Sequence, residues 1–200
     1  YQTHSKMRIN GGLAKGIPLR VTKTNKLRPA TDANRERLFS SLGHFIQEKS
    51  ILDLFAGTGS YGLEALSRGA RSATFVEADR KVFRDLKLNL ANTAKSAKLT
   101  PDAGCLENRD VIEFLRHCDD TFDLVFLDPP YSEFTQLGSI VLELLKSRNL
   151  VGADSLLVHE SPPEEMKDFP GWSLIKTLGK EKRGSPSYRF YKLSQPESFQ

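Results

Sequence analysis

The chain has 200 residues, with 29 lysines and arginines against 25 aspartates and glutamates, a net charge of +4 and a pI near 9.0. Its length and its ordinary apolar and charged fractions predict one globular domain and exclude global disorder. No apolar run reaches the length of a membrane span, no signal peptide opens the chain, and neither the two cysteines nor the four histidines have metal-ligand spacing. We therefore expect a metal-free protein of a reduced, cytoplasmic compartment, with no membrane partner.

The N-terminal region is basic and has no acidic residue before Asp32. Residues 1–6 resemble a remnant of an expression tag, which makes Met7 the expected natural start. Glycines and a proline in 8–21 predict a short hairpin or extended arm, followed by a polar linker. The charge fits either a solvated tail or a surface that holds a phosphate backbone, and its cations are Lys6, Arg8, Lys15, Arg20, Lys23, Lys26 and Arg28.

From residue 31 onward, strands alternate with helices in the hydrophobic pattern. Thr31 or Asp32 is placed to cap the first helix, which the pattern carries to about Glu48. The expected strands are 51–55, 73–76, 103–106, 121–127, 155–158, 172–178 and 188–193, and the expected helices between them are 63–68, 80–94, 111–115 and 134–145. This alternation predicts an α/β fold with a parallel sheet, and the last two strands predict an antiparallel pair at one edge. The expected divisions are an arm at 7–32, one domain at 33–194 and a short tail at 195–200.

A glycine-rich loop follows the strand at 51–55 and opens the next helix. It reads Asp53-Leu-Phe-Ala-Gly-Thr-Gly-Ser-Tyr-Gly62, and its glycines allow a sharp turn and a close backbone approach to a ligand. A dinucleotide-binding fold has a similar turn, but a carboxylate at Asp53 would repel a pyrophosphate. Asp53 suits the cationic amino-acid end of S-adenosylmethionine instead.

Two more acids follow later strands. Glu77, after the second strand, is placed to accept hydrogen bonds from both ribose hydroxyls of a nucleoside. Asp110, after the third strand, could accept a hydrogen bond from an adenine amine or could cap the following helix.

The strongest motif ends the strand at 121–127, where the chain reads Phe122-Asp-Leu-Val-Phe-Leu-Asp-Pro-Pro-Tyr131. An apolar run closed by two prolines predicts a buried strand that leaves the sheet stiffly. A carboxylate, a rigid carbonyl and an aromatic ring are thereby presented at the carboxyl edge of the sheet, where α/β proteins bind ligands.

These motifs together resemble a class I S-adenosylmethionine-dependent methyltransferase, and more narrowly the bacterial 16S ribosomal RNA guanine-N2 methyltransferase family, RsmD. The resemblance spans nearly the whole chain, through Arg8–Gly12, Leu27–Asp32, Leu52–Gly59, Leu63–Ala70, Val76-Glu77, Asp128–Tyr131 and Ser187–Tyr191. It implies a Rossmann-like, seven-stranded and mostly parallel sheet with an antiparallel last strand, helices on both faces and a small N-terminal hairpin. The loop after Gly179 resembles the family less closely than these segments do.

The resemblance implies methyl transfer from S-adenosylmethionine, without a metal, to an exocyclic guanine N2 of small-subunit ribosomal RNA, as free RNA or within the 30S particle. Asp128 and the Pro129 carbonyl would each accept one N–H of the amine, and Tyr131 would stack on the base. The residues expected to bind the cofactor are Asp53, Phe55, Ala56, Gly57, Thr58, Gly59, Glu77, Asp79, Asp110, Val111 and Asp128. The residues expected to bind RNA are Arg8, Lys15, Arg20, Lys23, Lys26, Arg28, Arg35, Lys182 and Arg183.

Three other functions compete with this interpretation. Methylation of an adenine or cytosine amine in DNA, or of adenine N6 in RNA, uses similar motifs, but a DNA enzyme needs a target-recognition domain for which 200 residues leave little room. A non-catalytic ribosome-assembly factor would have no need of intact acids at Asp53, Glu77 and Asp128. A dinucleotide oxidoreductase gives Asp128-Pro-Pro-Tyr131 no role. We expect a monomer, and the target nucleotide is left open.

Overall fold

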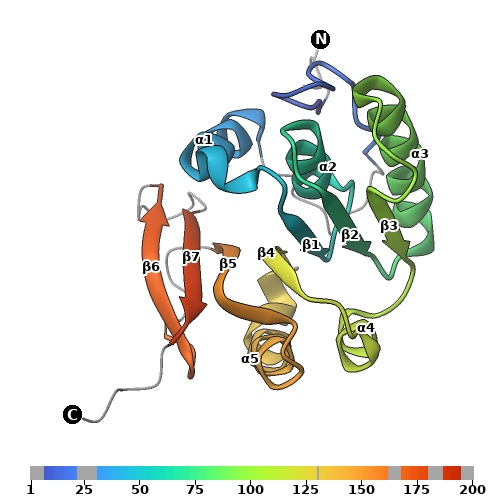
Figure 1. The fold of residues 1–200 in the computed structure, drawn as a ribbon. Helices are drawn as coiled ribbons and strands as arrows, with labels where there is room; N and C mark the ends of the chain where they lie inside the picture. The colour runs from blue at the N-terminus through green and yellow to red at the C-terminus, as the bar shows by residue number, and fades with distance from the viewer. Residues whose placement is uncertain (1–6, 22–30, 130, 162–167, 180–186, 195–200) are drawn as a thin grey trace.

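A single seven-stranded sheet organises the protein. The computed structural model describes residues 7–21, 31–129, 131–161, 168–179 and 187–194, and for residues 131–136 and 161 it describes the backbone only. The strand order is β3-β2-β1-β4-β5-β7-β6 (Figure 1). The strands are β1 Ser50–Leu54, β2 Ser72–Val76, β3 Gly104–Glu107, β4 Phe122–Leu127, β5 Val151–Ser161, β6 Trp172–Leu178 and β7 Ser187–Leu193. Strands β1 to β5 pair in parallel, whereas β7 runs antiparallel to both β5 and β6. The predicted mostly parallel sheet with an antiparallel last strand is confirmed.

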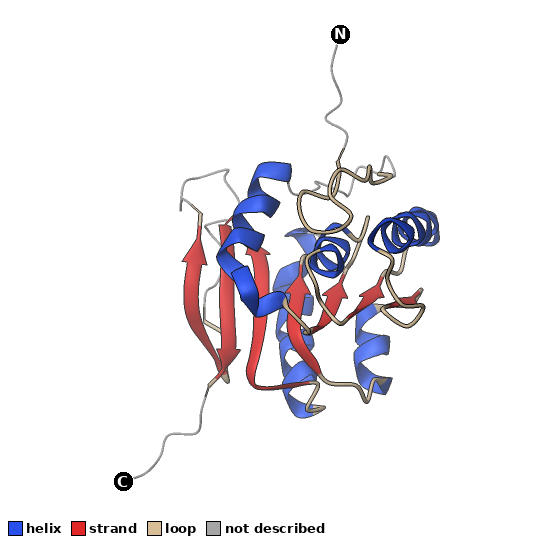
Figure 2. Ribbon diagram, turned by 45° about the horizontal axis from the view of Figure 1, so that its top comes forward, coloured by secondary structure: helices blue, strands red, loops and turns tan. Residues whose placement is uncertain are grey.

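Helices cover both faces of this sheet (Figures 1 and 2). On one face lie α1 Asp32–Leu42 with the 3-10 turn η1 Gly43–Ile46, α2 Ser60–Ser67 and α3 Arg80–Ala97. On the other lie α4 Val111–His117 and α5 Tyr131–Ser147. Each face has its own cluster of buried apolar side chains, because every central strand is buried on both sides. No helix in the described ranges is long and apolar enough to cross a membrane.

Several element boundaries differ from those expected. The first helix leaves α geometry at Leu42, because Gly43 has φ of 52°, and continues as η1 to Ile46. Helix α5 begins at Tyr131, three residues before the expected start, and α3 continues to Ala97. Strand β5 begins at Val151 instead of residue 155, because backbone pairing with Phe122 of β4 does not require an apolar side-chain pattern.

The start of the described chain forms the expected hairpin and packs onto α2. Backbone hydrogen bonds join Ile9 N–H to the Ile17 carbonyl at 2.9 Å and Leu19 N–H to the Met7 carbonyl at 2.8 Å. The side chains of Met7, Ile9 and Leu19 are buried in the same apolar cluster as α1 and α2. Gly12, with φ of 75°, passes so close to helix α2 that a Cβ would lie 1.8 Å from the Ser67 carbonyl oxygen. The described part of the basic segment is therefore packed structure and not a solvated tail.

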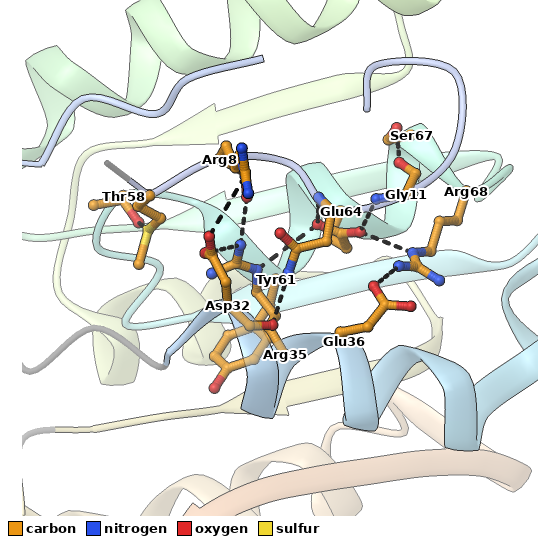
Figure 3. A network of polar contacts seen from close by, with 12 residues as sticks. Arg8, Gly11, Asp32, Arg35, Glu36, Thr58, Tyr61, Glu64, Ser67 and Arg68 are labelled. Atoms are coloured by element: carbon orange, nitrogen blue, oxygen red, sulfur yellow. Dashed lines mark hydrogen bonds and ion pairs between the residues drawn. The ribbon is translucent and has the colours of Figure 1, made fainter. Parts of the chain in front are cut away.

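A buried carboxylate fastens this hairpin (Figure 3). The Glu64 side chain, fully buried on α2, accepts the Asn10 N–H at 2.8 Å and the Gly11 N–H at 2.7 Å. It also forms ion pairs with Arg68 at 2.8 Å and with Arg35 at 3.7 Å. Since buried charges need partners, this network fixes the hairpin relative to α1 and α2.

Candidate functional site

The carboxyl ends of β1, β2, β4 and β5 lie side by side at one edge of the sheet, because these strands are parallel. An acidic residue lies at or just beyond the end of each strand: Asp53, Glu77, Asp128 and Glu160. Three of these were predicted from the sequence, and Glu160 was not.

The glycine loop is a tight turn between β1 and α2. Phe55, Gly57 and Gly59 have φ of 58°, 56° and 78°, all in the left-handed region that favours glycine. The Ala56 N–H donates to the Val76 carbonyl at 3.0 Å, and the Gly59 N–H donates to the Ala56 carbonyl at 2.7 Å. The loop thus presents its backbone at the start of α2, as the sequence predicted.

Thr58 has a different environment from the rest of the loop. Its side chain is buried, and its hydroxyl lies 3.6 Å from the Met7 sulfur of the hairpin. Its carbonyl accepts a hydrogen bond from the buried Asn89 amide at 2.9 Å. The side chain of Thr58 therefore joins the loop to the hairpin.

Asp53 is buried at the end of β1. Its Oδ2 accepts the Gly62 N–H at 2.9 Å, which ties the strand to α2. The pKa of Asp53 is raised to about 8, chiefly by burial; the Gly62 hydrogen bond lowers it and the nearby Glu77 carboxylate raises it, both by smaller amounts. A cation placed beside Asp53 would favour its ionised form.

Glu77 joins the glycine loop to the start of α3. Its carboxylate accepts the Gly57 N–H at 2.9 Å and the Asp79 N–H at 2.7 Å. Burial raises the pKa of Glu77, and these two hydrogen bonds partly offset that effect. Asp79 in turn caps α3 by accepting the Lys81 N–H and the Val82 N–H.

Asp110 caps α4, the alternative that the sequence left open. Its Oδ1 accepts the Ile112 N–H at 2.8 Å and the Glu113 N–H at 3.1 Å. The side chain is exposed beyond the end of β3, while Val111 is buried in the core. The contact of Asp110 with an adenine stays a prediction.

Asp128 lies directly after β4 and is partly buried. Burial, followed by the charges of Glu160 and Asp53, raises the pKa of Asp128 well above its ordinary value. Pro129 is buried, Pro130 lies outside the described residues, and Tyr131 begins α5 with a side chain that also lies outside them. The stacking role of Tyr131 therefore stays a prediction.

The structure adds a polar cluster that the sequence did not reveal. The Tyr61 hydroxyl donates to the buried Glu160 carboxylate and lies 3.1 Å from the Tyr188 hydroxyl. These residues line a small pocket together with Asp128. His159 is buried beside them, and its Nδ1 donates to the Leu127 carbonyl at 2.9 Å because a carbonyl can only accept. One signal for Glu160 was available, since it stands two residues after the apolar run 156–158, as Asp128 stands directly after the run 124–127.

Comparison with known proteins identifies the family. The family model described as "Conserved hypothetical protein 95" matches residues 7–192. The chain is 35% identical over 188 residues to the Ribosomal RNA small subunit methyltransferase D of Haemophilus influenzae, covering 92% of this chain and 93% of that protein. The corresponding Escherichia coli protein is 36% identical, with 92% and 89% covered. The chain belongs to the ribosomal RNA small subunit methyltransferase D family. The prediction made from the motifs is confirmed.

Solved structures agree with this assignment. The fold matches that of the Escherichia coli protein yhhF with a TM-score of 0.80 and 34% identity, covering 94% of this chain and 98% of that one. A more distant structure, SMU.776, was solved as a complex with SAH; it is 16% identical with a TM-score of 0.63 and covers 89% of this chain and 54% of that one. At that identity it shows the shared fold alone.

The residues expected to bind RNA have several environments in this family member. Arg8, Lys15 and Arg20 are exposed on the hairpin. Arg35 is fully buried on α1, where it pairs with Asp32 at 2.9 Å and donates to the Arg8 carbonyl (Figure 3). The prediction that Arg35 contacts RNA is wrong, because this guanidinium is enclosed by the hairpin and α1. Five others lie outside the described residues: Lys23, Lys26, Arg28, Lys182 and Arg183.

Metal ligands were not expected from the sequence. Among the described residues no three histidine, cysteine, aspartate or glutamate side chains group as metal ligands. Cys105 is exposed, Cys118 is buried, and both are free thiols.

Proposed function

We propose that this protein transfers a methyl group from S-adenosylmethionine to the exocyclic N2 of a guanine in small-subunit ribosomal RNA. The supporting observation is the position of Asp128 and Pro129 at the end of β4, beside the glycine loop that follows β1. Family membership supports the reaction, because the curated relatives are named for methylation of ribosomal RNA of the small subunit. The proposed substrate is this RNA within the 30S particle, during or after assembly of the particle.

The chemistry of the donor set fits the cofactor. The glycine loop turns tightly enough for a ligand to approach its backbone, the Asp53 carboxylate suits a cationic amino group, and the Glu77 carboxylate suits the hydroxyls of a ribose. Asp110 is the proposed acceptor for the adenine amine, and Asp79, at the start of α3, the proposed neighbour of the ribose. When bound, the cofactor supplies an electrophilic methyl group on a sulfonium.

Asp128 and the Pro129 carbonyl are proposed to orient the guanine amine. A guanine amine is a weak nucleophile because its lone pair is conjugated with the ring. When the amine donates one N–H to Asp128 and the other to the Pro129 carbonyl, its lone pair is turned toward the methyl group. Such alignment accounts for a large part of the barrier reduction in transfer reactions. The Asp128 carboxylate then stabilises the positive charge that develops on nitrogen and accepts a proton. Its raised pKa makes it a stronger base than an exposed aspartate.

Exposed cations of the hairpin are the proposed RNA contacts among the described residues: Arg8, Lys15 and Arg20. The hairpin is fastened to α2, and the Arg20 backbone is held by the Asn89 side chain at 2.8 Å and 3.0 Å. Cations on a fixed element hold phosphates in register with the sheet edge at a lower entropic cost than cations on a loose tail.

The test is methyl transfer by an Asp128→Asn variant. Asparagine keeps the shape but removes the charge, so turnover on unmodified small-subunit particles should fall by at least about tenfold, and by as much as the 10²- to 10⁴-fold typical of a general base. Calorimetric affinity for S-adenosylmethionine should change little. Mapping of the labelled base identifies the nucleotide. Near-normal turnover would remove Asp128 from the mechanism, and label on an adenine would replace guanine as the substrate.

A further inference from the structure

Glu160 lies next to Asp128 because β5 and β4 are neighbouring parallel strands. Leu127 pairs with His159 in their register, so the residue that follows each of them reaches the same level of the sheet edge. Both carboxyl groups line the small pocket bounded by Tyr61 and Tyr188. Two carboxyl groups buried together disfavour each other's ionised form, since like charges repel strongly where water is excluded.

The two acids differ in their hydrogen-bond donors. Glu160 accepts a hydrogen bond from the Tyr61 hydroxyl, which is itself 3.1 Å from the Tyr188 hydroxyl. Burial raises the pKa of both tyrosines, so they stay neutral and available as donors. Tyr61 is also held in place by its ring, which stacks on Phe126 at 5.2 Å between centroids. Among the residues that the structure describes, none donates a hydrogen bond to the Asp128 carboxyl, which keeps its oxygens for a substrate amine.

We propose that Glu160, held by Tyr61 and Tyr188, is a positioning residue that controls how readily Asp128 binds and releases a proton during methyl transfer. The proposal rests on the proposed function, in which an ionised Asp128 accepts an N–H of the amine. In that step the amine nitrogen forms a bond to the methyl carbon with its lone pair, and the carbon–sulfur bond breaks to leave a thioether. One N–H proton passes to Asp128. With an ionised Glu160 beside it, Asp128 holds that proton more tightly and is a stronger base.

Charged groups on β1, β5 and α1 also act on the pair or on its tyrosines. Burial contributes most to the raised pKa of both acids; beyond burial, Asp53 on β1 raises the pKa of Asp128, and His159 on β5 lowers that of Glu160. Arg35 on α1 acts on Tyr188, whose pKa it lowers against a larger effect of burial. Since these groups interact, the measured ionisation belongs to the Asp128–Glu160 pair and not to either residue alone.

A defined pH dependence follows. Activity requires an ionised Asp128, so the rate should rise with pH through the apparent pKa of the pair. Glu160→Gln removes one negative charge, which lets Asp128 ionise at lower pH and shifts the acidic limb of the kcat profile downward by about one pH unit, a tenfold change in proton concentration. Tyr61→Phe removes the donor to Glu160, favours its protonated form and should shift the limb in the same direction.

The experiment measures methyl transfer to unmodified small-subunit particles from about pH 5.5 to about pH 9 with saturating substrates. The variants are Glu160→Gln and Tyr61→Phe, and the control is Glu143→Gln, an exposed acid on α5. Thermal unfolding shows which variants fold. If Glu160→Gln does not fold, the acidic limb of the kcat profile of Tyr61→Phe tests the proposal instead. A limb that coincides with the wild type, with only a lower plateau, overturns the role of Glu160. Absence of transfer by the wild type at every pH refutes the proposed function itself.

Discussion

Replacing Glu64 by glutamine tests whether one buried carboxylate holds the basic hairpin on α2. Glu64 oxygens accept the Asn10 and Gly11 N–H groups and the Arg68 side chain. A glutamine side chain has only one oxygen that can accept a hydrogen bond. Its NH₂ group would therefore face the backbone N–H of Asn10 or Gly11, which is also a donor. The substitution also removes the charge that pairs with the buried Arg35.

The expected cost is about 3 kcal/mol, at the low end of the 3–5 kcal/mol typical of breaking a buried ion pair, because Asp32 still pairs with Arg35. In a domain of this size about 1 kcal/mol lowers Tm by 2–4 °C, so Tm should fall by roughly 6–12 °C. Hydrogen exchange of the Asn10 and Gly11 amides should accelerate, since each loses a buried acceptor.

The matched control is Glu36→Gln. Glu36 pairs with the same Arg68 side chain but is half exposed, so its loss should cost less than about 1 kcal/mol. Differential scanning calorimetry of both variants, with hydrogen exchange measured by mass spectrometry, makes the comparison. Equal Tm values for the two variants, or unchanged exchange of the hairpin amides in Glu64→Gln, would refute this account of the hairpin.

Two further predictions concern ligands. Because burial raises the pKa of Asp53 to about 8, a cationic amino group that binds there must displace a proton from the carboxyl. The affinity of the wild type for S-adenosylmethionine, relative to that of Asp53→Asn, should therefore rise by up to about tenfold per pH unit from pH 6 to 8. Calorimetry over this pH range measures both affinities. Parallel profiles would remove Asp53 from cation binding. Replacing Lys15 and Arg20 by alanine should lower the slope of log RNA affinity against log salt by about 1.4–1.8, at 0.7–0.9 per phosphate contact. Lys146→Ala on α5 should leave that slope unchanged, and an unchanged slope in the double variant would exclude the hairpin as an RNA contact.

Local signals in the sequence were sufficient to predict the sheet, the glycine loop and the position of Asp128 at the end of a buried strand. Apolar runs that end in Gly57 or in Pro129 mark buried strands, because glycine and proline interrupt regular structure in ways that do not depend on distant residues. The order of helices and strands then restricts the topology to a few alternatives. Boundaries were less accurate where tertiary pairing overrides the pattern, as at Val151.

Contacts between residues distant in the sequence could not be predicted in this way. Tyr61 and Glu160 are 99 residues apart, and Tyr61 and Tyr188 are 127 apart. Arg35 was expected to bind RNA, but its environment depends on Glu64 and on how the hairpin folds over α1. The burial of a charged side chain is a property of packed surfaces, and one sequence with no structure does not reveal which partner it has.

The four acids at the sheet edge affect one another. Burial raises the pKa of all four, Asp53, Glu77, Asp128 and Glu160. Hydrogen bonds from backbone N–H groups or from Tyr61 offset this in part for Asp53, Glu77 and Glu160. A cation at this edge favours their ionised forms, and by reciprocal linkage their ionisation favours the cation. Under the proposed function, cofactor binding therefore prepares Asp128 to accept a proton. Methyl transfer converts a sulfonium to a neutral thioether as a proton reaches Asp128, so the affinity of this edge for the product is lower than for the cofactor. The same electrostatics that prepare the base would favour product release.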